Sequence, residues 1–300
     1  MTERYRRLVQ AAAWTAMVVA TVLLGIKLVA WWYTSSMSLL ASVVDSTLDI
    51  LASLTNLIVI RFALQPADEE HKFGHGKAES LAALAQSTFI VGSACFLILQ
   101  GIERLFRPSE LSEPGFGIYV SIAAIALTGG LVMFQKWVVR KTGSQAIAAD
   151  SLHYQSDLLM NVAIIVALAL SAYGFIYADA GFAILVGIFI LFSAYKMARD
   201  AVQSLLDHQL PPEEEEKILT LASGVAGVHG VHDLRTRQAG VTRFIQLHLE
   251  LDDELPLKDA HLIADEVEDR LEVVFPGADI LIHQDPVSVV RNSRREQAQL

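Results

Sequence analysis

Two short sequences inside long apolar stretches decide the fold of this chain: DSTLD at residues 45–49 and HYQSD at residues 153–157. Each has ionisable residues at its two ends, and residues four positions apart lie on one face of an α-helix. A carboxylate at the centre of a membrane-spanning helix costs about 2.5–3.5 kcal/mol on insertion scales, so its presence there indicates function. The sequence therefore predicts a four-ligand site for a divalent cation, formed by Asp45, Asp49, His153 and Asp157.

Other interpretations of these residues stay open at this point. Asp45 and Asp49 could cap a helix or pair with a buried cation, for which Lys27 in the first apolar stretch is the one nearby candidate. Chains of Asp and His inside a membrane also carry protons without binding a metal.

The surrounding sequence predicts a polytopic α-helical membrane protein with six transmembrane helices in residues 1–206. The chain is 53% hydrophobic, and six stretches reach the roughly 20 mostly apolar residues that a span requires. These are residues 9–33, 38–64, 80–105, 115–139, 146–173 and 179–206. Nine Lys and Arg residues flank the spans on the side of the N-terminus and two on the opposite side. The positive-inside rule therefore places both termini in the cytoplasm.

The rest of the chain is acidic and predicts a soluble domain. Residues 207–300 have 19 acidic and 9 basic residues, whereas residues 1–206 have 14 of each. This balance argues against nucleic acid as a partner. The patterns predict a helix at 213–224, strands at 228–237 and 242–251, a helix at 256–275 and a strand at 279–285. We expect an α+β domain at 207–290, similar to a ferredoxin-like metallochaperone, and a disordered tail at 291–300.

Two further clusters predict metal binding outside the membrane. The single cysteine, Cys95, excludes thiolate zinc sites, so His, Asp and Glu must supply the ligands. Asp68, His71 and His75 follow the second span closely enough to close on one ion, although histidines in loops are often only solvated. In the acidic domain we expect a zinc site, with two ions bridged by Asp285, from His232, His248, His261, His283 and Asp285. Any one of these histidines could instead be an ordinary surface residue.

Lys77 and Asp207 have opposite charge at similar expected membrane depth. An ion pair between helices is one interpretation, and a lysine that extends to the membrane interface is the other.

Three sequences together resemble the cation diffusion facilitator family: Asp45-x3-Asp49, FGHGKAE at 73–79 and DSLHYQSD at 150–157. The similarity extends from about Tyr5 to Val290 and is greatest to the bacterial ferrous-iron and zinc efflux pumps. It implies a homodimeric, proton-coupled antiporter of the bacterial inner membrane that exports divalent cations. We expect export by alternating access at the four-ligand site. It also implies that the four intramembrane residues are transport ligands and that Lys77 and Asp207 form a charge pair near the dimer contact.

The chain differs from zinc-selective relatives, which often have His at the position of Asp45. Oxygen donors should widen selectivity to Zn(II), Fe(II) and Cd(II), with Mn(II) as a further candidate. The metal is then substrate and regulatory ligand, and no catalytic cofactor is expected. Two other classes are alternatives: a membrane-embedded metal sensor without net transport, and an intramembrane metallohydrolase. The hydrolase is disfavoured because the chain has no separate general-base motif such as H-E-x-x-H.

Overall fold

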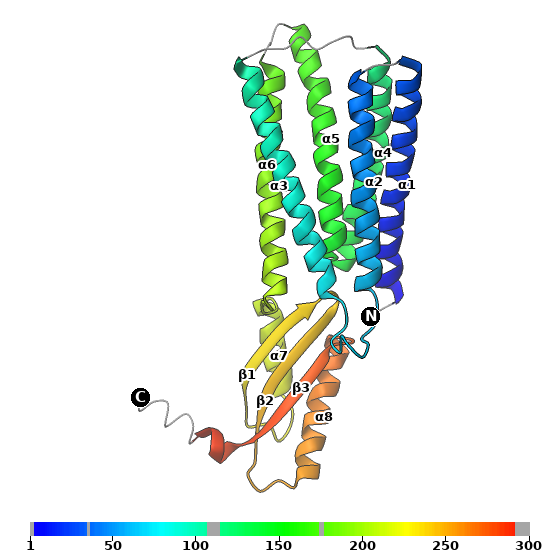
Figure 1. The fold of residues 1–300 in the computed structure, drawn as a ribbon. Coiled ribbons are helices and arrows are strands. Elements are labelled where there is room, and N and C mark those ends of the chain that lie inside the picture. The colour runs from blue at the N-terminus through cyan, green and yellow to red at the C-terminus, as the bar shows by residue number, and fades with distance from the viewer. Residues whose placement is uncertain (1–2, 35–36, 107–114, 174–176, 292–300) are drawn as a thin grey trace. The chain divides into compact units, whose positions relative to one another are not determined.

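The chain folds into a unit of long helices and a smaller unit that contains a β-sheet (Figure 1). The computed structural model describes residues 3–34, 37–106, 115–173 and 177–291. The helical unit runs from Thr2 to Val202, and the second unit begins at Gln203. Of the predicted tail at 291–300, the structure describes Arg291, and residues 292–300 lie outside the described residues.

Six long helices form the helical unit, as predicted. Their bounds are α1 Glu3–Thr34, α2 Met37–Ala63, α3 Lys77–Phe106, α4 Gly115–Thr142, α5 Gln145–Ala172 and α6 Ala178–Leu205. Within the described residues, α1, α2, α3, α4 and α6 are each long and apolar enough to cross a membrane. The remaining long helix, α5, carries His153 and Asp157.

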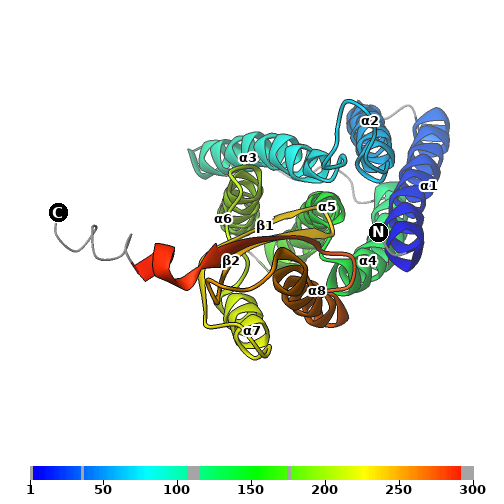
Figure 2. The ribbon, with the colours of Figure 1, turned by 90° about the horizontal axis from the view of Figure 1, so that it is seen from below.

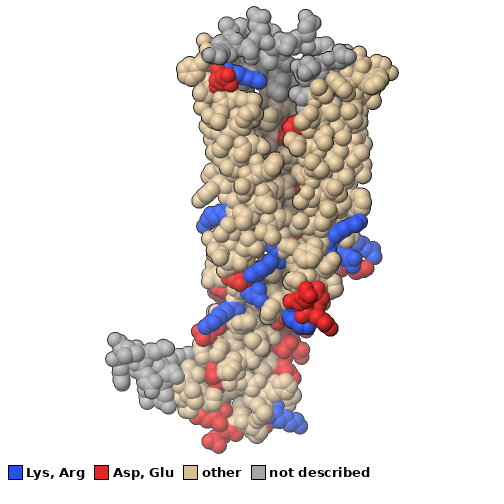
Figure 3. Space-filling model, in the orientation of Figure 1, with Lys and Arg blue, Asp and Glu red and all other residues tan. Residues whose placement is uncertain are grey.

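The outer surface of this unit is suited to lipid. Only 22–33% of the most apolar stretch of each of the five helices is buried inside the protein. Large apolar side chains such as Phe89 on α3 and Phe192 on α6 are 70% and 69% exposed. Charged side chains are sparse over the middle of the helices in Figure 3. Exposed apolar surface on this scale indicates a membrane-embedded unit.

The helices pack so that α2 and α5 come into contact inside the unit. The helix α1 packs against α2 and α4, α4 packs against α5, and α3 packs against α2 and α5. In Figures 1 and 2, α3 and α6 lie side by side. Glycines permit this close approach: a Cβ at Gly187 would lie 2.6 Å from Cγ1 of Ile98, and one at Gly101 would lie 2.7 Å from Cγ1 of Ile184.

The second unit has the predicted αββαβ order. Its elements are α7 Pro212–Ser223, β1 Gly230–Ala239, β2 Thr242–Leu251, α8 Leu257–Val274 and β3 Asp279–Pro286. In the sheet, β2 lies between β1, which is antiparallel to it, and β3, which is parallel. Figure 2 shows α7 and α8 on the same side of this sheet.

The core of this unit follows from the alternation along β2. Ile245, Leu247 and Leu249 are fully buried and pack with Val267 and Leu271 of α8. The predicted start of β1, at residue 228, was wrong by two residues. The reason is a turn at 225–228, where the Val228 N–H donates to the Val225 carbonyl and Gly227 has φ +92°.

Candidate metal centres

The two polar sequences of the helical unit meet between α2 and α5. His153 Nε2 lies 3.1 Å from Asp49 Oδ1 and 3.8 Å from Asp157 Oδ2. One ligand atom from each of the three residues lies within 4.8 Å of the other two. The helical spacing places His153 and Asp157 on one face of α5, and the contact between the helices adds Asp49. Two carboxylates and one imidazole therefore converge between apolar helices, as a divalent cation requires.

Asp45 is not part of this three-residue group. It lies one turn before Asp49 on α2, and its side chain is exposed. The neighbouring residue Ser46 accepts a hydrogen bond from Lys27 Nζ at 2.6 Å. The role of Asp45 as a fourth ligand stays a prediction.

Sequence reasoning missed the polar contacts that hold α5 in place. Gln135 Nε2 donates to Asp150 Oδ2 at 2.6 Å, and both side chains are completely buried. The hydroxyls of Tyr154 and Ser53 lie 2.7 Å apart and join α5 to α2. Buried polar groups need such partners, and polar residues inside apolar stretches were the available signal.

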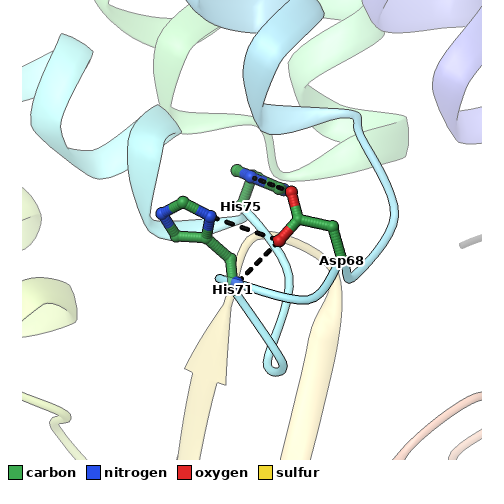
Figure 4. A group of neighbouring side chains, drawn as sticks. All are labelled: Asp68, His71 and His75. Carbon is green, nitrogen blue, oxygen red and sulfur yellow. Dashed lines mark hydrogen bonds and ion pairs between the residues drawn. The ribbon is translucent and has the colours of Figure 1, made fainter.

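The loop between α2 and α3 closes Asp68, His71 and His75 into one group (Figure 4). Asp68 Oδ1 lies 3.4 Å from His71 Nδ1, and Asp68 Oδ2 lies 3.4 Å from His75 Nε2. The backbone N–H groups of His71 and Glu70 donate to Asp68 Oδ1 at 2.6 and 3.0 Å. The hydrogen bond from the His71 backbone N–H is the largest cause that lowers the pKa of Asp68.

His75 is the inner residue of this loop site. Its side chain is 2% exposed, and its ring lies edge-on to Phe62 at 4.5 Å between centroids. Gly74 precedes it with φ +78°, a conformation that glycine adopts without strain. The two imidazoles and the carboxylate form a compact three-donor group with one exposed side.

In the second unit, the strand register assembles three of the predicted histidines. His232 pairs with His248 across β1 and β2, and His248 pairs with His283 across β2 and β3. His248 Nδ1 lies 2.7 Å from Asp285 Oδ2, and His232 Nε2 lies 3.5 Å from the same oxygen. His283 Nε2 lies 3.2 Å from Asp285 Oδ1. Asp285 thus has imidazoles on both carboxylate oxygens, a geometry suited to one or two metal ions.

His261 does not join this group in the described residues of the chain. It lies on α8, where its Nδ1 is 3.4 Å from Asp265 Oδ1, and both side chains are at least half exposed. Its role as a ligand stays a prediction.

Sequence reasoning also missed Glu250, whose Oε1 lies 3.1 Å from His232 Nδ1. Its side chain is 7% exposed, and it follows His248 by two residues on the same face of β2. Gly230 lies opposite it in the register, and a Cβ there would be 2.8 Å from Glu250 Cδ. Glycine at this position therefore leaves room for the buried carboxylate. The alternation of side chains along β2 places Glu250 on the same face as His248, and this pattern in the sequence could have indicated its role.

Asp207 has a partner within its own unit. Its Oδ1 lies 3.4 Å from Arg237 Nη1, and the Arg237 guanidinium lies 4.1 Å from the centroid of the Phe244 ring. Lys77 belongs to the helical unit, so its pairing with Asp207 stays a prediction.

Two family models together match most of the chain. Residues 13–206 match the model of the cation efflux transmembrane domain, and residues 210–287 match that of the cation efflux protein cytoplasmic domain. The chain belongs to the cation efflux family. Cation efflux relatives include the cation-efflux pump FieF of Serratia proteamaculans, 60% identical over all 300 residues of both chains. The FieF pump of Klebsiella pneumoniae strain 342 is 60% identical over 97% of each chain.

Membership of the cation efflux family settles the general class of the protein. It is a multi-pass membrane transporter and cation efflux pump, and its cytoplasmic domain model, ZT_dimer, indicates a homodimer. Among solved structures, the transporter CzrB in its Zn form is 39% identical over 27% of this chain and 92% of that chain, with a TM-score of 0.26. The metal-bound C-terminal domain of CzcD from Thermotoga maritima is 24% identical over 26% of this chain and 95% of that chain, with a TM-score of 0.24.

Proposed function

We propose that this pump exports divalent metal cations from the bacterial cytoplasm in exchange for protons. The convergence of Asp49, His153 and Asp157 between α2 and α5 carries the proposal. Residues 1–206 form the transport domain in the inner membrane, with both termini in the cytoplasm. Residues 207–290 form the cytoplasmic metal-binding and dimerisation domain.

The donor set supports a transition-metal substrate. Carboxylate oxygens and an imidazole nitrogen suit Zn(II), Fe(II) and Cd(II), and an oxygen-rich set also admits Mn(II). Asp45 adds a third carboxylate one turn away on α2. The substrate range is therefore broader than that of a site with two imidazoles.

Proton coupling follows from competition for the same atoms. Metal binding requires ionised carboxylates and a neutral imidazole, so protons displace the metal. When the site faces the cytoplasm the ligands bind the ion. When it faces the opposite side, protons driven by the proton-motive force replace the ion. The helices that carry the ligands alternate between these two accessible states.

The clusters outside the membrane have separate proposed roles. Asp68, His71 and His75 hold a second ion at the loop. The cytoplasmic cluster, with Asp285 as the bridge between two ions, fills as the metal concentration rises, draws the paired cytoplasmic domains together and favours transport. His232→Ala should then abolish the dependence of flux on cytoplasmic metal, and an unchanged dependence would contradict this role.

Reconstituted vesicles test the transport proposal directly. Asp49→Asn keeps the side-chain size and removes the charge, so zinc uptake and zinc-driven pH change should both disappear. Asp200→Asn removes an exposed carboxylate from α6 and serves as the matched control, with both signals unchanged. Coupled flux in Asp49→Asn would refute the site assignment. Metal binding without flux in the unmodified protein would favour a sensor, and proton movement without metal would favour a proton relay. Parallel assays with Fe(II), Cd(II) and Mn(II) define the substrate range.

A further inference from the structure

Lys27 places a positive charge inside the helical unit. It lies on α1, seven residues before the end of that helix at Thr34. Its Nζ donates to Ser46 Oγ at 2.6 Å and lies 3.4 Å from the Ser42 carbonyl oxygen. Both acceptors belong to α2, and Ser46 is 1% exposed. The ammonium is therefore fixed at the contact between α1 and α2.

This position differs from that of an ordinary membrane lysine. A lysine near the end of a membrane helix usually extends its ammonium to the polar interface. Lys27 instead donates to oxygens of a neighbouring helix within the apolar unit. Lys27 is partly buried, and a charge held partly out of water is costly without opposite charge nearby.

The metal-binding carboxylates supply that opposite charge. Ser46 directly follows Asp45 and precedes Asp49 by three residues, so the ammonium lies at the level of the cluster. Its hydrogen-bond acceptors on α2 are neutral oxygens. These contacts do not neutralise the positive charge of Lys27, so it can balance the negative charge of the nearby carboxylates.

We propose that Lys27 is the fixed counter-charge of the transport site and makes the metal-loaded site electrically neutral. This inference rests on the proposed transport function. With Asp45 as the expected fourth ligand, the three carboxylates contribute three negative charges, a divalent cation contributes two positive charges, and Lys27 contributes the third positive charge. Neutrality lowers the cost of moving the loaded site through a low-dielectric environment. It also selects for valence, because a monovalent ion leaves a net negative charge and a trivalent ion a net positive one.

Equilibrium exchange of labelled zinc isolates the step in which the loaded site moves. Proteoliposomes contain equal, saturating zinc and equal pH on both sides, so the site moves almost only in its zinc-loaded form, and a potassium gradient with valinomycin sets the voltage. Exchange by the unmodified protein and by Lys27→Arg should not respond to voltage. Lys27→Met, which keeps much of the length but lacks the charge, should exchange about tenfold more slowly or worse and should respond to voltage. A full charge crossing 100 mV corresponds to at most about a fiftyfold effect.

The possible results separate this inference from its premise. Lys196→Met removes an exposed lysine from α6 and should match the unmodified protein. If Lys27→Met is slow but insensitive to voltage, or if Lys27→Arg is equally slow, the lysine is only structural and the inference fails. Voltage-dependent exchange by the unmodified protein, or unaltered exchange by Lys27→Met, also overturns it. If the unmodified protein exchanges no zinc, the transport proposal itself fails.

Discussion

Glu250 should strengthen zinc binding by the cytoplasmic cluster although it is not one of the three converging ligands. Its Oε1 lies 3.1 Å from His232 Nδ1, and the other ring nitrogen of His232 lies 3.5 Å from Asp285 Oδ2. An ionised carboxylate accepts the Nδ1–H, which fixes the tautomer and turns Nε2 toward the metal position. Carboxylates behind ligating histidines act in this way in many metal sites. Glu250→Gln removes the charge and keeps the shape of the side chain.

The expected loss follows from the nature of this one hydrogen bond. A hydrogen bond to a charged group contributes about 1.5–3 kcal/mol, and one between neutral groups about 0.5–1.5 kcal/mol. The amide oxygen of glutamine can still accept the Nδ1–H, so the difference is about 1–1.5 kcal/mol. At about 1.4 kcal/mol for each factor of ten, zinc should bind roughly five- to tenfold more weakly.

A zinc titration against a chromogenic chelator measures this change in the purified full-length protein. Asp49→Asn and Asp68→Asn in the same background remove a ligand from each of the other two centres. Glu254→Gln, which neutralises an exposed carboxylate between β2 and α8, is the matched control and should bind zinc with unchanged affinity. Equal affinity for Glu250→Gln and Glu254→Gln, with intact folding, would refute the proposed action of Glu250 on His232.

Three further predictions concern stability. Tyr5 Oη donates at 2.7 Å to Glu79, which is 3% exposed, so Tyr5→Phe should cost about 1.5–3 kcal/mol and lower the midpoint of thermal unfolding in detergent. Gly187→Ala should destabilise the protein by about 1–3 kcal/mol because its Cβ would lie 2.6 Å from a side-chain carbon of α3. Gly181→Ala is the control and should not destabilise, because a Cβ there would have no atom within 4 Å. Equal effects of the two substitutions in thermal unfolding would contradict this packing. Hydrogen bonds from Ser288 lower the pKa of Asp253 from 3.8. Its contribution to the free energy of unfolding is therefore present above pH 3.8 and is lost as the pH falls through the folded-state pKa. Asp253→Asn should reduce stability at neutral pH but not in strong acid, as measured by unfolding across pH.

The sequence was most informative where one periodicity controls the geometry. Spacing of four residues on α5 predicted that His153 and Asp157 share a face, and the apolar residues at alternate positions of β2 do form the core. Contacts between elements were harder to predict. The row of His232, His248 and His283 depends on the register of three strands, and β1 is irregular between residues 232 and 235. The separation of His261, on α8, from this row likewise depends on tertiary packing, which no local pattern encodes.

The three centres differ in composition in a way that charge and dielectric explain. The intramembrane group has two carboxylates for one imidazole, whereas the loop and cytoplasmic groups each have two imidazoles for one carboxylate. A divalent cation between apolar helices must have its charge cancelled locally, because water is not there to screen it. Asp49 and Asp157 alone cancel the charge of the ion, and the added charge of Asp45 then needs Lys27 as its balance. The loop and cytoplasmic groups lie outside the expected membrane spans, so a net positive charge is tolerated there and the imidazoles can favour zinc. The proposed neutral loaded state therefore goes together with an expected broad metal range at the intramembrane centre.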